Sequence, residues 1–196
     1  MTRKALLRFE QVGCRRGGAM LFSDISFVLD AGGALLLHGS NGAGKSSLIR
    51  LAAGLLRPEG GTVDRSCAIG LLTHDLALDD GLTVKSAVGF WAKLDGGDTS
   101  EADAALQAVG LASLAHVPVR FLSSGQKRRA ALARVIASAA PLWLLDEPGV
   151  GLDSRSLDLL TSAIGRHRSS GGAVVVATHM DLGLGDARRI DLGVAC

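Results

Sequence analysis

Residues 34–53 read ALLLHGSNGAGKSSLIRLAA, and this stretch decides the fold. It opens with a short apolar run, Ala34–His38, typical of strands that are buried on both faces. A glycine-rich loop, Gly39–Gly44, follows, and Ser46–Ala53 then places apolar side chains on one helical face until Gly54 stops the helix. A buried strand, a tight loop and an amphipathic helix in this order predict an α/β fold with a mostly parallel sheet.

The loop and the helix start match the pattern G-x-x-x-x-G-K-[ST], which predicts a phosphate site. Glycines let consecutive backbone N–H groups approach phosphate oxygens, and the helix N-terminus adds its dipole. We expect Lys45 to reach the β- and γ-phosphates of a nucleotide and the Ser46 hydroxyl to bind Mg²⁺. A chance glycine loop is the alternative. The predicted nucleotide-binding residues are Gly39, Ser40, Asn41, Gly42, Ala43, Gly44, Lys45, Ser46 and Ser47.

A second motif lies at Leu142–Glu147, which reads LWLLDE, an apolar run that ends in two acidic residues. A strand that ends in a carboxylate places Asp146 at the carboxyl edge of the sheet, where it can hold Mg²⁺ through water. Glu147 points elsewhere and can polarise an attacking water. The alternative is an acidic helix start punctuated by Pro148. No guanine-reading N-K-x-D motif occurs, so the expected ligands are ATP and Mg²⁺.

The rest of the chain alternates strands and helices. Strands are predicted at Ala5–Val12, Leu21–Leu29, Thr62–Val63, Ala68–Thr73, Leu142–Asp146 and Ala173–Thr178. Helices are predicted at Val84–Leu94, at Ser100–Val109 with Ser100 as N-cap, at Ser124–Ala139 and near Ser154–His167. Strand signals are sparse from about Asp79 to Ala139. This pattern predicts one domain, 1–196, with a helical subdomain inserted at about 79–139.

Composition bounds the class of protein. The 196 residues suit one domain, and 47% hydrophobic with 20% charged residues excludes disorder as the main state. A net charge of +2 is too weak to indicate a nucleic-acid partner. Three scattered cysteines, Cys14, Cys67 and Cys196, argue against a disulfide framework or a zinc site and fit a reducing cytosol. No apolar stretch approaches the ~20 residues of a membrane span, so we expect a protein that is soluble or held at a membrane by a partner.

A short motif narrows the class. Leu122–Gln126 reads LSSGQ just before a predicted helix, and here the sequence resembles the ATP-binding cassette (ABC) ATPases, whose signature is LSGGQ. Ser124 replaces one glycine, but a hydroxyl and N–H groups at a helix N-terminus can still bind an anion. In the family this loop binds the γ-phosphate of ATP held by the other subunit. The resemblance therefore assigns a role in trans to Ser123, Ser124, Gly125 and Gln126.

The alternative for this motif is an ordinary serine N-cap. The basic residues that follow it are then a solvated helix face: Lys127, Arg128, Arg129 and Arg134.

Other family elements fall in order along almost the whole chain. Gly149–Asp153 resembles the D-loop, with Asp153 at its acidic position, and His179 stands where the family has its switch histidine. The resemblance implies an ABC ATPase fold, a P-loop NTPase core with N-terminal antiparallel strands and a helical insertion. It assigns catalysis to Lys45, Glu147 and His179.

Two positions depart from the family pattern. The aromatic residue that stacks on adenine in the family would fall near Arg15 and Arg16, and the Arg16 guanidinium can stack instead. Where the family has a Gln that senses the γ-phosphate, this chain has His74 or Asp75. The resemblance thus gives Asp75 as a further candidate metal ligand.

Within the family, several stretches resemble the ATP-binding subunits of bacterial haem exporters used in cytochrome c maturation. They include LFSDISF from Leu21, LTHDLALDDGLTVKSAVGFWA from Leu72 and FLSSGQKRRAALARVIASAAPLWLLDEPGVGLD from Phe121. The resemblance implies a head-to-tail homodimer on two integral membrane subunits, at the cytoplasmic face of the bacterial inner membrane. Haem enters only indirectly, and no nucleic acid is involved.

Alternatives within the class are other short bacterial cassettes, for lipoprotein release or multidrug export. A soluble cassette acting on nucleic acid or ribosomes is a further one, although such proteins usually carry long coiled insertions or two cassettes. The apolar stretch Leu76–Trp91 is the predicted docking groove for a membrane subunit, against the alternative of ordinary packing within the insertion.

Overall fold

Two sheets organise the molecule. The computed structural model describes residues 4–94 and 98–193. Strands β1 (Ala5–Arg16), β2 (Ala19–Asp30) and β4 (Gly60–Arg65) form an antiparallel sheet in the order β2-β1-β4. The chain reverses between β1 and β2 through Gly17 and Gly18, both with positive φ. This sheet is the N-terminal antiparallel layer that the resemblance implied.

The second sheet is parallel throughout. Its order is β5 (Ile69–Leu72), β6 (Leu142–Asp146), β7 (Ala173–Ala177), β3 (Ala34–His38), β8 (Arg188–Asp191). Every residue of β6 and β7 is buried, as their unbroken apolar sequences predict. Because all five strands run the same way, the ends of β3, β6 and β7 meet at one edge, which carries the site.

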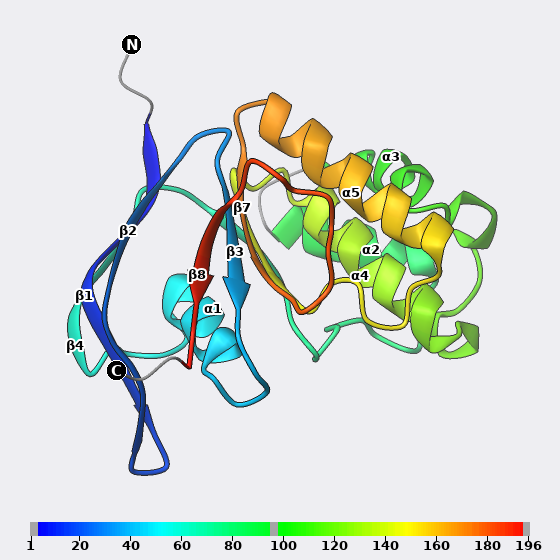
Figure 1. Ribbon diagram of the computed structural model, residues 1–196. Helices are drawn as coiled ribbons and strands as arrows, with labels where there is room; N and C mark the ends of the chain where they lie inside the picture. Colours follow the sequence, from blue (N-terminus) through cyan, green and yellow to red (C-terminus); the bar gives the residue numbers. More distant parts are fainter. Residues whose placement is uncertain (1–3, 95–97, 194–196) are drawn as a thin grey trace.

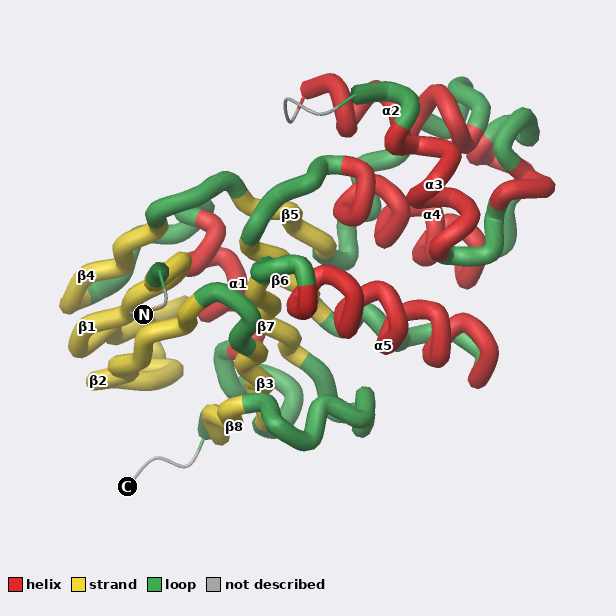
Figure 2. Tube along the Cα trace, turned by 90° about the horizontal axis from the view of Figure 1, so that it is seen from above, coloured by secondary structure: helices red, strands yellow, loops and turns green. Residues whose placement is uncertain are grey.

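Helices separate and cover the sheets (Figures 1 and 2). Helix α1 (Lys45–Ala53) lies between the two sheets, and its Leu48 and Ile49 are fully buried in the core that they share. Helix α5 (Ser154–Ser169) covers the other face of the parallel sheet. The resulting α/β fold confirms the predicted fold class.

Between β5 and β6 the described chain forms helices and loops without a regular strand. Helix α2 (Val84–Leu94), α3 (Glu101–Ala108) and α4 (Ser124–Ala137) pack together, with short 3-10 turns at Ala112–Leu114 and Val119–Phe121. Figure 2 shows this group beside the parallel sheet, away from the antiparallel strands. It corresponds to the expected helical insertion.

Several element boundaries differ from the prediction. The sequence carries no strand signal for β8, because RRID is charged and the strand lies largely exposed at the edge of the sheet. Ser100 occupies the N-cap position of α3 but makes no capping bond; its N–H donates instead to Asp98 Oδ1 at 3.1 Å. Two of the three cysteines, Cys14 and Cys67, have free thiols in the structure, and Cys196 lies outside the described residues.

Candidate nucleotide-binding site

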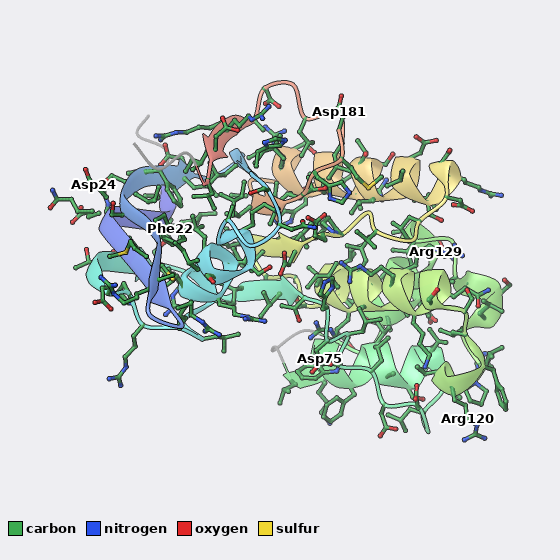
Figure 3. The ribbon with its side chains drawn as sticks, turned by 60° about the horizontal axis from the view of Figure 1, so that its bottom comes forward. Phe22, Asp24, Asp75, Arg120, Arg129 and Asp181 are labelled. Carbon is green, nitrogen blue, oxygen red and sulfur yellow. The ribbon has the colours of Figure 1, made fainter. Side chains whose placement is uncertain are left out.

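The phosphate loop joins β3 to α1 and requires glycine at two positions. Gly39 has φ 149°, and a Cβ there would lie 2.4 Å from the Leu192 carbonyl oxygen. Gly44 has φ 101°, and a Cβ there would lie 2.9 Å from the Phe22 ring. Any side chain at either position would therefore displace β2 or the segment after β8. Figure 3 shows Phe22 on β2, on the side of the loop that faces the antiparallel sheet.

Lys45 is held inside the loop that precedes it. Its Nζ donates to the Gly39 carbonyl at 2.8 Å and to the Ser40 carbonyl at 3.2 Å. The same Nζ lies 4.0 Å from Glu147 Oε1, and both side chains are largely shielded from solvent. A buried ammonium that faces a loop of backbone N–H groups is a complement to phosphate oxygens.

The end of β6 presents two carboxylates with different surroundings. Asp146 is buried, and its Oδ1 has no hydrogen-bond partner among the described residues. Such an orphaned acceptor beside a phosphate loop fits a cation or its bound water, so the side chains present suit Mg²⁺. Glu147 turns away through a positive φ of 48°, while its N–H donates to the Ala177 carbonyl at 2.8 Å.

His179 completes the cluster from the loop after β7. Its Nδ1 lies 3.1 Å from Glu147 Oε2, and the imidazole is 63% exposed. The two atoms are close but not hydrogen-bonded, since Oε2 has no hydrogen-bond partner among the described residues. The structure thus brings Lys45, Glu147 and His179 together, with the Glu147 carboxylate between an ammonium and an imidazole.

A cavity of about 360 Å³ lies beside Lys45 and Glu147. It is lined by the phosphate loop, α1, β2, the loop after β5 and the end of β6. We call it the phosphate-loop cavity. Its lining residues are Leu21, Asn41, Gly42, Gly44, Lys45, Ser46, Ser47, His74 and Glu147.

Asp75 is not among the residues that line the phosphate-loop cavity, and its role as a metal ligand stays a prediction. Its Oδ1 accepts the N–H of Ala77 at 3.2 Å, and its carbonyl accepts the Thr73 hydroxyl at 3.0 Å, so a local turn holds it. Figure 3 shows it on the side of the helical insertion, apart from Phe22. His74 is the residue of this loop that faces the site.

Arg16 is exposed at the end of β1 and is absent from the residues that line the cavity. Its role as an adenine-stacking residue stays a prediction.

The signature loop, Leu122–Gln126, forms the start of α4 away from the phosphate-loop cavity. Ser123 accepts the Gln126 N–H at 3.2 Å, and Gln126 Oε1 accepts the Ser123 N–H at 2.8 Å, which is a capping box. A separate hollow, the signature hollow, contains the loop together with Gly151 and Asp153. A Cβ on Gly125 would lie 2.9 Å from the Gly151 carbonyl oxygen, so the two segments touch.

Asp153 caps α5. Its Oδ1 accepts the Ser156 N–H at 2.8 Å. Hydrogen bonding to the Ser156 side chain, and then to its backbone, holds the pKa of the Asp153 carboxyl below its usual range. The residue assigned to the D-loop therefore stands at the rim of the signature hollow in a fixed orientation.

The model of the ABC transporter family matches residues 22–150 of the chain. The chain belongs to this family. Two proteins named cytochrome c biogenesis ATP-binding export protein CcmA are close in sequence. That of Sphingopyxis alaskensis is 49% identical over 96% of this chain and 97% of its own length. That of Novosphingobium aromaticivorans is 50% identical over 91% of each. The chain is thus a member of the CcmA group of ABC ATPases.

Solved structures of ABC transporters have the same fold. An inward-facing putative metal-chelate type ABC transporter matches with a TM-score of 0.79 and 27% identity, over 96% of this chain and 79% of that one. An ATP-binding subunit of an ABC transporter matches with a TM-score of 0.85 over 95% and 85% of the two chains, at 21% identity. As an ABC ATPase, the chain hydrolyses ATP in a transporter with membrane partners. None of the helices in residues 4–94 and 98–193 has the length and apolar character of a membrane span.

The view of the basic residues on α4 as a solvated face of the ABC signature helix is wrong for Arg128. Its side chain is buried, and it reaches the backbone of the loop after β5 and of the end of β6. A run of four cationic residues on one helix offers no local signal that distinguishes the buried one. Only the packing of α4 against β5 and β6 does so.

The predicted docking stretch also divides in the structure. Leu76 and Leu78 pack against the core, and the Trp91 indole N–H donates to the Ala77 carbonyl at 2.7 Å while the Arg134 guanidinium covers its ring. The exposed apolar side chains nearby are Leu82, Phe90 and Leu94.

Proposed function

We propose that this ABC ATPase hydrolyses ATP at the phosphate-loop cavity, with Lys45 on the β- and γ-phosphates and Glu147 as the base that polarises water. The observation that carries the proposal is that Lys45 and Glu147 line one cavity with the phosphate-loop residues, while His179 Nδ1 lies 3.1 Å from Glu147 Oε2. His179, in contact with Glu147, keeps the carboxylate in register with the γ-phosphate.

Mg²⁺ suits the carboxyl edge of the sheet. The Ser46 hydroxyl at the start of α1 and the orphaned, buried Asp146 Oδ1 are the oxygen ligands that the chain offers, the latter through water. When bound, the ion neutralises the charge that develops on the phosphates. His74, at the mouth of the cavity, contributes a ring nitrogen toward the γ-phosphate.

We infer that two copies pair head to tail, with each signature loop completing the site of the other chain. Within one chain the signature hollow and the phosphate-loop cavity share no lining residue, so the signature loop needs a ligand held elsewhere. The first N–H groups of an α-helix have no intrahelical acceptor, and those at the start of α4 suit the γ-phosphate of a partner's ATP.

The names of the relatives support a role in export during cytochrome c biogenesis. We propose that the dimer drives two integral membrane subunits of a haem exporter from the cytoplasmic face of the bacterial inner membrane. The cavities described contain no feature that would select haem, so haem belongs to the membrane part of the complex. The exposed side chains of Leu82, Phe90 and Leu94 on the helical insertion form the surface that best suits a membrane-subunit helix.

The phosphate site is tested with Lys45→Ala. Removal of the ammonium takes away charge stabilisation at the transferring phosphoryl group, so ATP hydrolysis by the subunit purified with its membrane partners should fall at least ~10²-fold. Lys85→Ala is the matched control, because it removes a lysine whose partner is Asp103 on the far surface of the helical insertion. Hydrolysis by Lys45→Ala at the wild-type rate under saturating Mg²⁺ would overturn the assignment.

A further inference from the structure

Arg128 is a buried cation at a junction of three segments. It lies in the second turn of α4, just beyond the signature loop, and its side chain is 7% exposed. Its Nη1 donates to the Thr73 carbonyl at 3.3 Å, and its Nη2 donates to the Asp146 carbonyl at 2.7 Å and to the Glu147 carbonyl. One guanidinium thus binds the backbone at the ends of both β5 and β6.

These carbonyls belong to the segments that face the nucleotide site. Thr73 immediately precedes His74, which lines the phosphate-loop cavity, and the other two acceptors are the backbone of the two acidic residues themselves. Glu147 has a φ of 48°, which is rare for a residue other than glycine and persists only where neighbours hold it. Arg128 binds its carbonyl, and the Ala177 carbonyl binds its N–H.

The electrostatics suit a fixed anchor. Burial lowers the pKa of Arg128, while attraction to Asp146 and Glu147 opposes that shift. Arginine nevertheless stays charged in proteins, so a permanent positive charge lies behind the two carboxylates. It reduces the repulsion between the two carboxylates, and the hydrogen bonds of Arg128 go to the backbone carbonyls of these residues rather than to their carboxylate oxygens.

Neighbouring arginines on α4 hold other parts of the chain. Arg134 donates to the Leu71 carbonyl within β5 and covers the Trp91 ring, and Arg129 donates to the Val109 and Gly110 carbonyls after α3. These contacts join α4 to β5 and to the turn after α3, whereas the contacts of Arg128 join it to the end of β6.

We propose that Arg128 is a positioning residue that couples the signature helix to the Glu147 backbone and to the His74 loop. A displacement of α4 when its signature loop meets a partner's nucleotide then reaches the hydrolytic carboxylate of the same chain. The inference rests on the proposed function, because it takes Glu147 as the base and the signature loop as a contact made in trans.

The experiment compares Arg128→Met, Arg128→Lys and Arg134→Met in the subunit purified with its membrane partners. Arg128→Met keeps volume but removes all donors, so kcat should fall about 10²-fold, the size expected for a misplaced catalytic group. The KM for ATP should stay within about threefold, because the phosphate loop is untouched. Arg128→Lys keeps the positive charge but has a single nitrogen donor. Its kcat should lie between those of wild type and Arg128→Met, about tenfold below wild type.

Arg134→Met is the matched control, because it removes a shielded arginine of the same helix that binds a backbone carbonyl in β5. It should lower the melting midpoint and leave kcat within about threefold. Hydrogen exchange at residues 73–78 and 147–150 should speed up in Arg128→Met and not in Arg134→Met, and this readout needs no hydrolysis.

Equal losses of kcat in the two methionine variants would overturn the inference. So would an Arg128→Met variant that loses only thermal stability, or an Arg128→Lys variant with full kcat. If Arg128→Met does not fold, the kcat of Arg128→Lys tests the inference instead, and a kcat equal to that of wild type overturns it. Absence of ATP hydrolysis in the wild-type complex would instead contradict the proposed function, so the two failures differ.

Discussion

At the scale of single residues, the site depends on the different directions taken by two adjacent carboxylates, those of Asp146 and Glu147. Asp146 ends β6 with its carboxylate buried, whereas Glu147 turns through a left-handed backbone conformation toward Lys45 and His179. A strand continued through Glu147 would send its side chain to the opposite face of the sheet from Asp146. The turn brings Glu147 to the cavity mouth instead, so the two carboxylates can serve different partners.

Glu147→Gln should separate binding from hydrolysis. Loss of a general base typically costs about 10²–10⁴-fold in rate and leaves ligand binding intact, so this variant should bind ATP and stall in a dimer. ATP binding is followed by fluorescence of a labelled nucleotide, and the dimer by sedimentation.

Asp146→Asn is the paired control for that division of roles. It weakens the acceptor that faces the cation, so its ATP binding should require more Mg²⁺ than that of Glu147→Gln. Superimposable Mg²⁺ titrations for the two variants would count against the separate roles of the two acids.

At the scale of elements, the start of α4 serves two purposes. Ser123 caps the helix through its side chain, and the same turn presents N–H groups at the positive end of the helix dipole. The two roles respond differently to charge. A carboxylate at the N-cap position can still accept the helix N–H groups, but its negative charge repels a phosphate.

Ser123→Asp should therefore keep the fold and lose ATP-driven pairing. Asp caps as well as Ser, while Ser123→Ala should cost about 1 kcal/mol of unfolding free energy. Ser123→Asn is the matched control, because it caps without charge and should still pair. Melting midpoints and ATP-dependent dimer formation distinguish the three variants.

Mixing Ser123→Asp with Lys45→Ala subunits tests the role in trans. A heterodimer has one intact composite site and one doubly damaged site, so the ATP-driven pairing that either variant alone lacks should return. No recovery in confirmed heterodimers would place the action of the signature loop within its own chain.

A different contact fastens α5 to the parallel sheet. The His167 ring stacks on Trp143 of β6 with centroids 3.9 Å apart and planes 7° apart, and His167 Nε2 lies 3.2 Å from the Ala173 carbonyl oxygen. Burial lowers the pKa of His167 below its ordinary value of 6.5. The neutral ring is the form that the folded protein accommodates.

Stability should thus fall as the pH drops below about 6.5 toward the lowered pKa of the folded state, because the unfolded chain takes up a proton that the folded one resists. His167→Phe keeps the stack and removes this titration, so its unfolding free energy should vary less between pH 7 and pH 5. Urea unfolding at several pH values measures this dependence of the unfolding free energy on pH. Exposed His116→Gln is the control, and a wild-type slope in His167→Phe would refute the assignment.

At the scale of the whole molecule, the helical insertion offers the surface for a membrane partner. The Phe90 side chain is 57% exposed, whereas Leu78 packs against the core. Phe90→Glu should release the subunit from membranes without lowering its melting midpoint, since surface substitutions usually stay within about 0.5 kcal/mol. Cell fractionation and thermal unfolding provide the two measurements.

Leu55→Glu is the matched control for this surface, because Leu55 is 66% exposed at the end of α1, outside the helical insertion. It should leave membrane association intact. Leu78→Glu, in contrast, should destabilise the subunit itself. Full membrane association of Phe90→Glu would move the docking surface elsewhere.

Much of the molecule could be predicted from short-range patterns. The spacing from Gly39 to Ser46 predicts the phosphate loop, and the apolar runs Leu142–Asp146 and Ala173–Ala177 predict buried parallel strands. Backbone conformation over such short stretches depends on neighbouring side chains, on glycine at positive φ and on the period of apolar residues. The family motif then placed the acidic pair, the signature and the histidine in order.

Long-range packing decided the rest. The burial of Arg128 depends on contacts with residues 55 and 18 positions away. The charged strand β8 forms because β3 offers it an open edge. Such contacts join segments whose separation in sequence carries no local signal, so only the tertiary structure, in which burial and hydrogen bonding select among equivalent residues, determined them.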